Sequence, residues 1–135
     1  MIYLMADANI QGQIDRLSKR MQAVDWREFW TFLQLSFLTF ADVGLDPADS
    51  DAVVWQRCQE RQVFLLTSNR NDKDPDSLEA TIRIHNTPQC LPVFTIGDTD
   101  RISVDGSYCE RVIETLFAYL LEAENIRGTG RLYLP

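Results

Sequence analysis

Residues 1–9 read MIYLMADAN, a short apolar run that ends at an aspartate and gives way to a helical pattern. We interpret this stretch as the central strand of a parallel sheet, with Asp7 at its carboxyl end. In open parallel α/β sheets, ligands bind in the crevice outside the carboxyl ends of the strands. The stretch therefore predicts an α/β fold in which Asp7 faces the functional site.

Apolar runs and helical patterns alternate along the rest of the chain. We expect strands over residues 35–41, 63–67 and 92–96, and helices over residues 10–21, 26–33, 50–62, 76–86 and 107–121. Asn9 is a good N-cap for the first helix. The capping-box pattern marks three further helix starts, at Asp25 with Glu28, Asp76 with Glu79 and Ser107 with Glu110. The tail, residues 127–135, suits an edge strand, a docked segment or a dimer contact.

The order of these elements, βα(α)βαβαβα, defines the fold class. Crossover connections between parallel strands are right-handed and place helices on the faces of the sheet. We therefore predict an α/β fold, a three-layer α/β/α sandwich with a central, mostly parallel sheet of four to five strands. A chain of 135 residues fits a single domain, residues 1–135, that buries a core without disulfides or a structural metal.

Composition and charge narrow the class of protein. Hydrophobic residues make up 45% of the chain and charged residues 24%, as in soluble globular proteins. No apolar run approaches the roughly 20 residues of a membrane span, and the N-terminus lacks the features of a secretory signal. We therefore expect a cytoplasmic protein with no membrane partner. The net charge of −7 argues against nonspecific nucleic-acid binding, unless the negative charge gathers around a metal.

The cysteines and the histidine argue against several kinds of site. Cys58, Cys90 and Cys109 are odd in number, lie far apart and form no CxxC pair, so neither a disulfide framework nor a zinc site is indicated. His85, the sole histidine, has no cysteine or serine constellation nearby, which leaves little room for a Ser-His or Cys-His nucleophile. The P-loop, dinucleotide-binding and G-x-S-x-G motifs are also missing from the sequence. The acidic residues remain as the candidates for chemistry.

Acidic and amide side chains follow the predicted strands and open the third helix. They are Asp7, Asp42, Ser68 with Asn69, Asp98 with Asp100, and Asp49 with Asp51. Because parallel strands bring their carboxyl ends to one rim, we expect several of them to converge there. Neighbouring carboxylates repel unless a cation lies among them, and oxygen ligands suit Mg²⁺ or Mn²⁺, which assist phosphodiester hydrolysis. Acids are also common in loops and N-caps, so a purely structural role is the alternative.

Three segments carry a resemblance to a known family. They are MADAN at residues 5–9, VGLDPADSD at residues 43–51 and FLLTSNRND at residues 64–72. In order and spacing they resemble the PIN-domain superfamily, and more closely its short PIN-like group of predicted toxin nucleases. Members of that group carry a strand ending in DAN or DEN, a G-L segment with an Asp before a helix, and a T-x-D-x-D-F block.

The resemblance implies a Mg²⁺- or Mn²⁺-dependent ribonuclease with Asp7 and Asp51 as catalytic, metal-binding carboxylates. The third segment departs from the family pattern, because Asn69 and Asn71 stand where the family has carboxylates. An amide oxygen can ligate Mg²⁺ but brings no negative charge. We therefore expect Asn69 or Asp72 to complete the set of metal ligands.

The same rim supplies further candidate residues. Asn9, beside Asp7, is implied as a pocket residue, and the rim position of Ser68 and Asp98 suggests the same role. Arg70 and Lys73 lie in the loop after the third strand, where they are the candidates for contacting RNA phosphates. The expected partners are an RNA substrate, an antitoxin or other protein, and a second copy in a homodimer.

The main alternative is a catalytically degenerate PIN-like protein that acts as a protein-binding or scaffold module. The two asparagines of the third segment and the acidic net charge motivate it. Its contact surface would be the aromatic helix, residues 26–33, or the tail RLYLP. A phosphoaspartate receiver and a DxD-type phosphatase fit less well, since the first strand ends in Asp7-Ala8-Asn9 rather than in paired acids.

Overall fold

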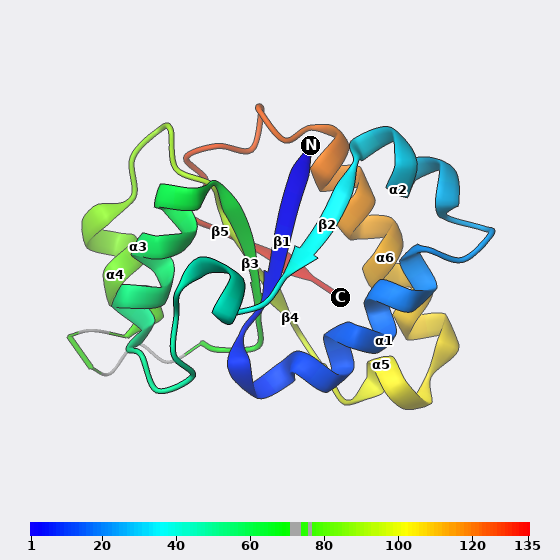
Figure 1. Cartoon of the computed structure of the whole chain (residues 1–135), viewed down its shortest axis with the longest axis horizontal. Coiled ribbons are helices and arrows are strands. Elements are labelled where there is room, and N and C mark those ends of the chain that lie inside the picture. Colours follow the sequence, from blue (N-terminus) through cyan, green and yellow to red (C-terminus); the bar gives the residue numbers. More distant parts are fainter. Residues whose placement is uncertain (71–73, 76) are drawn as a thin grey trace.

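One parallel sheet forms the centre of the molecule (Figure 1). In the computed structural model, which describes residues 1–70, 74–75 and 77–135, its strands are β1 (Ile2–Ala6), β2 (Leu35–Leu38), β3 (Val63–Thr67), β4 (Val93–Ile96) and β5 (Arg131–Leu134). The strand order is β2-β1-β3-β4-β5, and each neighbouring pair is parallel. Of the three outcomes left open for the tail, the structure shows the edge strand.

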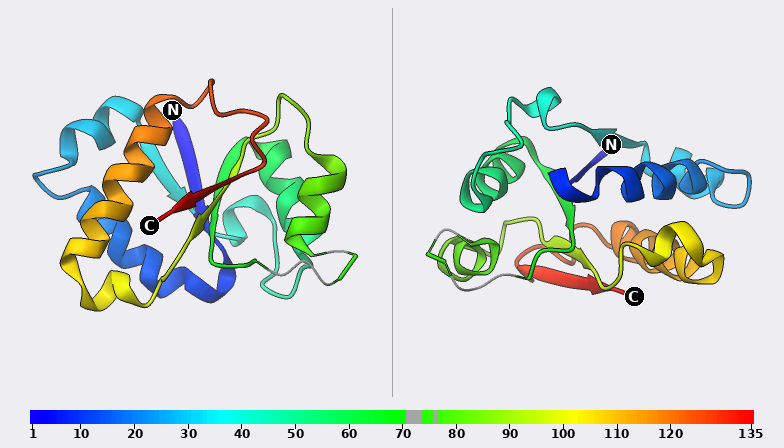
Figure 2. Two further views of the ribbon diagram at one scale, coloured as in Figure 1. Left: turned by 180° about the vertical axis from the view of Figure 1, so that it is seen from behind. Right: turned by 90° about the horizontal axis from the view of Figure 1, so that it is seen from below.

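Helices cover both faces of this sheet. They are η1 (Ala8–Ile10), α1 (Gln11–Met21), α2 (Arg27–Leu33), η2 (Ala41–Val43), α3 (Asp51–Arg61), α4 (Leu78–His85), α5 (Arg101–Val104) and α6 (Gly106–Leu121). Helices α1, α2, α5 and α6 lie on one side of the sheet and α3 and α4 on the other (Figures 1 and 2). The predicted three-layer α/β/α fold is confirmed. Within the described part of the chain, no helix is both long and apolar enough to span a bilayer.

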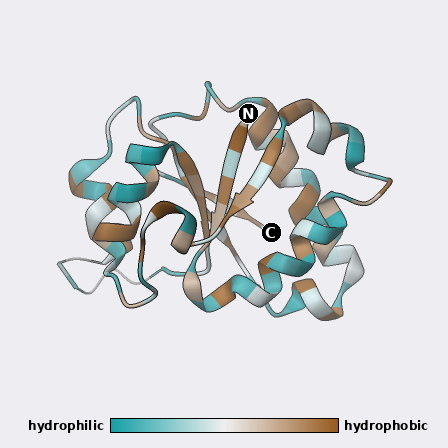
Figure 3. Cartoon of the chain, viewed as in Figure 1, coloured by the Kyte–Doolittle hydropathy of each residue, from teal (hydrophilic) through white to brown (hydrophobic). Residues whose placement is uncertain are grey.

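The alternation of side chains along the strands explains the two cores. Leu4 and Ala6 pack with α1 and α6, whereas Met5 packs with α3 and α4, because successive side chains of a strand point to opposite faces. All five residues of β3 are buried, as expected for a strand with helices on both faces. The hydrophobic colour in Figure 3 follows the strands and the inward sides of the helices. The apolar pattern of the sequence therefore accounts for both layers of helices.

The strand order places a topological switch point between β1 and β3. The chain leaves β1 for β2 on one side and then returns across β1 to β3 on the other. In doubly wound sheets with this order, the crevice at the carboxyl ends of β1 and β3 is where ligands bind. Asp7 directly follows β1 at that crevice, in agreement with the position predicted for it.

The first helix starts differently from the prediction. Asn9 caps no helix: it lies within η1, and the cap is Asp7, whose side chain accepts a hydrogen bond from the Ala8 amide at 2.9 Å. Helix α1 then continues from η1 without a side-chain cap. The second strand also ends early, at Leu38, because the chain turns into η2 three residues later.

Two capping boxes were predicted wrongly, because their acidic side chains form tertiary contacts instead of capping a helix. Asp25 does not cap α2; it pairs with Arg20 at 2.7 Å. Helix α6 begins one residue before Ser107 and is capped by Asp105, while Glu110 accepts hydrogen bonds from Arg20 and from Trp26. The third box includes Asp76, which lies outside the described residues, and the N-cap of α4 is Ser77.

Two glycines should respond oppositely to alanine. Gly128 has φ +86°, and a Cβ there would lie 3.0 Å from the Pro88 Cα, whereas a Cβ at Gly12 of α1 would meet nothing within 4 Å. We expect Gly128→Ala to lower the free energy of unfolding by about 2 kcal/mol and Gly12→Ala to raise it by roughly 0.5 kcal/mol. Urea denaturation of both variants measures these changes. Equal effects of the two substitutions would contradict this steric explanation.

Candidate functional site

A row of polar side chains crosses the carboxyl end of the sheet on the face covered by α3 and α4. Strand register pairs Ala6 with Leu66, which puts Asp7 beside Thr67, and it pairs Thr67 with Thr95 and Thr95 with Tyr133. Thr67 and Thr95 are fully buried. Buried hydroxyls require hydrogen-bond partners. The Thr67 hydroxyl finds them in Asp7 and Asn69, which follow β1 and β3, and the Thr95 hydroxyl finds one in Arg131 of β5.

Asp7 is half-buried and held at both carboxylate oxygens. Its Oδ1 accepts the Ala8 amide at 2.9 Å, and its Oδ2 accepts the Thr67 hydroxyl at 2.8 Å. Its main-chain amide donates to the Leu66 carbonyl at 2.8 Å, which continues the pairing of β1 with β3. The carboxylate is therefore fixed in orientation at the switch point, and each oxygen keeps further acceptor capacity.

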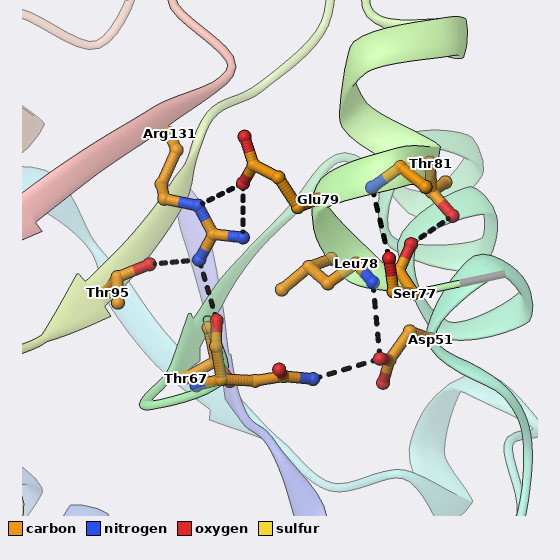
Figure 4. Close-up of polar contacts among 10 residues, drawn as sticks. Asp51, Thr67, Ser77, Leu78, Glu79, Thr81, Thr95 and Arg131 are labelled. Carbon is orange, nitrogen blue, oxygen red and sulfur yellow. Dashed lines mark hydrogen bonds and ion pairs between the residues drawn. The ribbon is translucent and has the colours of Figure 1, made fainter. Parts of the chain in front are cut away.

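Asp51 joins the same network from the first turn of α3. Its Oδ2 accepts the Asn69 side-chain amide at 2.9 Å and the Leu78 main-chain amide at 3.2 Å (Figure 4). The Asn69 main-chain amide in turn donates to the Thr67 hydroxyl at 2.9 Å. We call Asp7, Thr67, Asn69 and Asp51 the rim network. Through it, two carboxylates that are far apart in sequence are linked by two intervening polar side chains.

A buried arginine on the edge strand supports the rim network. The Arg131 side chain is only 6% exposed, and its guanidinium forms an ion pair with Glu79 of α4 at 2.8 Å (Figure 4). The same guanidinium donates to the Asn69 carbonyl at 2.8 Å and to the Thr95 hydroxyl at 2.6 Å. Arg131 was missed at the level of sequence, because its partners lie 36 to 62 residues away and no local pattern marks them.

Cys58 of α3 lies close enough to Asp7 for the carboxylate charge to affect the pKa of its thiol. Burial raises the pKa of the Cys58 thiol to about 12, and the negative charge of Asp7 adds to that rise. A thiol with such a pKa stays protonated at neutral pH and is a poor nucleophile. Cys58 is therefore a packing residue of the core beneath α3.

The other predicted site residues do not all meet at the rim network. Asn9 is exposed in η1, and Ser68 is half-buried between Thr67 and Asn69. Asp98 follows β4, which lies two strands, or about 10 Å, from β1. Among the described residues, its carboxylate accepts a hydrogen bond only from the Arg101 main-chain amide. Asp42 and Asp49 make local turn contacts, with the main-chain amides of Thr39 and Asp46, whereas Asp100 accepts the Gln13 side-chain amide of α1 at 3.3 Å.

The outcome for the loop after β3 is mixed. Arg70 is exposed, and its guanidinium carbon lies 5.4 Å from the centre of the Tyr133 ring. Asp72 and Lys73, predicted as a metal ligand and an RNA contact, lie outside the described residues, as does Asn71. These three predictions therefore stay predictions.

The rim network offers two carboxylates to a divalent cation. Over the described ranges, no group of three or more histidine, cysteine or acidic residues is placed to hold a metal ion. Mg²⁺, however, is often held by one or two carboxylates together with water and substrate phosphates, and Asp7 and Asp51 supply two. The Asn69 Nδ2 atom points at Asp51, so the amide would have to rotate before its oxygen could ligate. With that rotation, the set would comprise two carboxylates and one amide oxygen, which are the donor types that Mg²⁺ takes.

An open groove lies next to the rim network. It has a volume of about 510 Å³ and is lined mainly by apolar groups, including Ala8 after β1 and Phe40, Leu45 and Pro47 after β2. Because Ala8 directly follows Asp7, the groove borders the carboxyl end of β1 on the side of β2, although none of the four rim residues lines it.

The fold and the rim network define the class of protein: a doubly wound α/β protein with acidic groups at its switch point. No family model, no curated protein and no solved structure matches the chain. The PIN-like resemblance therefore rests on the three sequence segments alone.

Proposed function

We propose that this protein is a PIN-like, Mg²⁺- or Mn²⁺-dependent ribonuclease of the toxin type that hydrolyses RNA phosphodiesters. The observation that carries the proposal is the linkage of Asp7 and Asp51 through Thr67 and Asn69 at the β1/β3 switch point. These are the two residues to which the family resemblance assigns the metal. The site lies where doubly wound sheets bind their ligands.

Each residue of the rim network has a distinct task in this function. Asp7 and Asp51 would hold the cation, and a bound Mg²⁺ or Mn²⁺ supplies charge stabilisation and lowers the pKa of water. Thr67 holds the Asp7 carboxylate in one orientation by donating its hydroxyl proton. Asn69 occupies the place of a third carboxylate, and its amide offsets the charge of Asp51 by hydrogen bonding.

The substitution Asn69→Asp tests the proposal, because it restores the carboxylate that the family pattern contains. Without a cation, the new charge would face Asp51 and lose its hydrogen bond, so we expect a loss of about 1 to 2 kcal/mol in unfolding free energy in EDTA. With Mn²⁺ present, we expect roughly tenfold tighter binding and recovery of that stability. Calorimetry and thermal melts in EDTA and in Mn²⁺ measure both effects.

A matched control separates a specific site from a general effect of charge. Asn125→Asp adds the same charge at an exposed position after α6, and it should leave Mn²⁺ binding unchanged. Cleavage of a single-stranded RNA by wild type and by Asn69→Asp completes the test. Absence of Mn²⁺ binding and of cleavage in both proteins would overturn the nuclease proposal.

A second candidate function is a protein-binding module that has lost its metal. The specific observation in its favour is an exposed apolar stripe on α2 and the turn before it: Phe32 and Phe29 of the helix are 75% and 40% exposed, and Val24 of the turn is 74% exposed. Such a stripe suits an antitoxin, another protein or a second copy of this chain. In such a module the Asn69 amide permanently replaces the cation beside Asp51. A wild-type protein that binds no Mn²⁺ is the result that would favour this function.

A further inference from the structure

We propose that Arg70 and Tyr133 form a stacking subsite for a base of single-stranded RNA beside the rim network. The inference rests on the proposed function in taking RNA as the ligand. It adds a residue from the edge strand and a mode of recognition that the family resemblance does not supply.

The geometry of the pair suits a flat ligand. The Arg70 guanidinium lies over the Tyr133 ring, with 5.4 Å from its carbon to the ring centre. Both side chains are exposed, and Tyr133 is 54% accessible although it belongs to a strand. Its neighbour Leu134 is buried in the core on the opposite face. Tyr133 is therefore a partly exposed aromatic ring with a planar cation over it, and bases stack on both kinds of group.

The position of the pair relative to the two carboxylates suits a base further along the RNA strand. Tyr133 ends the row that runs through Thr67 and Thr95 from Asp7. Three strand spacings separate Tyr133 from Asp7, or about 14 Å. This span exceeds the reach of one nucleotide, so the pair would take a base further along the RNA strand from a phosphate held at the rim.

The backbone next to the pair is held in place. Arg70 directly follows Asn69, whose carbonyl accepts a hydrogen bond from the buried Arg131 guanidinium at 2.8 Å. Arg131 and Tyr133 are two residues apart on β5 and point to the same face of the sheet. One strand thus anchors the backbone next to Arg70 and carries the ring that Arg70 covers, which lowers the entropy cost of binding a base.

The charge of the protein favours a base over a phosphate as the group recognised here. The net charge is −7, and Asp98 and Asp51 lie at the same rim, so phosphate attraction is weak. Stacking does not depend on net charge, because each base has a π-face. The expected binding is therefore sensitive to the presence of bases and only weakly dependent on salt.

The test measures binding of a fluorescent hexa-adenylate RNA by anisotropy in EDTA, against an abasic oligomer with the same phosphates. We expect the wild type to prefer the base-containing RNA by about tenfold. Tyr133→Leu should lose this preference and Tyr133→Phe should keep it. Arg70→Lys keeps the positive charge but removes the planar guanidinium, so it should lose part of the preference for the base-containing RNA. Arg61→Gln removes a charge at the far end of α3 and should change nothing.

The outcomes separate this inference from the nuclease proposal, because binding is measured without a cation. Base-dependent binding without any metal-dependent cleavage would support the subsite and count against the nuclease. Three results would overturn the subsite. The wild type would bind the abasic oligomer as tightly as hexa-adenylate, or it would bind no RNA, or both Tyr133→Leu and Arg70→Lys would keep the full preference for the base-containing RNA. If Tyr133→Leu failed to fold, the Arg70 variant would decide, since Arg70 lies in an exposed loop.

Discussion

The proposed nuclease function predicts that Mn²⁺ binding and RNA cleavage both disappear when Asp7 is replaced by asparagine. Asp7 is the carboxylate at the switch point, and its replacement removes a negative charge from a site that has only two carboxylates among its described members. Loss of a group that merely supports a metal ligand typically costs ten- to hundredfold, so loss of a ligand should cost more than about a hundredfold in cleavage rate. Calorimetry with Mn²⁺ and a gel assay on single-stranded RNA measure the two effects.

The fold should survive this substitution. An asparagine side chain can still accept one of the two hydrogen bonds that Asp7 receives, from the Ala8 amide or from the Thr67 hydroxyl. The expected loss in unfolding free energy is about 1 kcal/mol. Asp42→Asn is the matched control, because Asp42 also follows a strand and accepts a main-chain amide, that of Thr39 at 2.8 Å. Cleavage that persisted in the Asp7 variant would remove Asp7 from the catalytic role.

The largest loss of stability should come from Arg131→Met. Arg131 is almost fully buried and pairs with Glu79, the Asn69 carbonyl and the Thr95 hydroxyl. Methionine fills a similar volume but removes the donor from the buried Thr95 hydroxyl and the Asn69 carbonyl and leaves Glu79, whose side chain is 33% exposed, without its ion pair, at a cost of about 3 kcal/mol. For a chain of this length, that corresponds to a melting temperature lower by roughly 10 °C.

Two comparisons identify the cause of this loss. Arg101→Met breaks an ion pair with Asp105 in which the side chains are 45% and 36% exposed, and it should cost much less stability than Arg131→Met because solvent screens the pair. The double variant Arg131→Met with Glu79→Met removes both charges and should be more stable than Arg131→Met alone. A similar loss for Arg101→Met and Arg131→Met would show that burial of the network does not govern its contribution.

Local patterns in the sequence were sufficient for most of the sheet. The VFLLT run predicted β3 with both bounds correct, because a strand covered on both faces is apolar throughout. The run that ends at Asp7 likewise predicted both β1 and the location of the acid at its carboxyl end. Helix starts were less predictable, as Asp25 and Glu110 show. A capping box and an ion pair use the same carboxylate, and the sequence does not reveal which partner is nearer.

The amino-acid sequence by itself determined the layers, the parallel sheet and the placement of Asp7 and Asp51 at strand and helix ends, because apolar periodicity and chain order act locally. Only the tertiary structure decided that Asn69 lies between Thr67 and Asp51, and that an arginine from the last strand supports it. These contacts join residues up to 62 positions apart, and strand register brings them together. Hydrogen bonding depends on tenths of an ångström, which residue spacing along a chain does not specify.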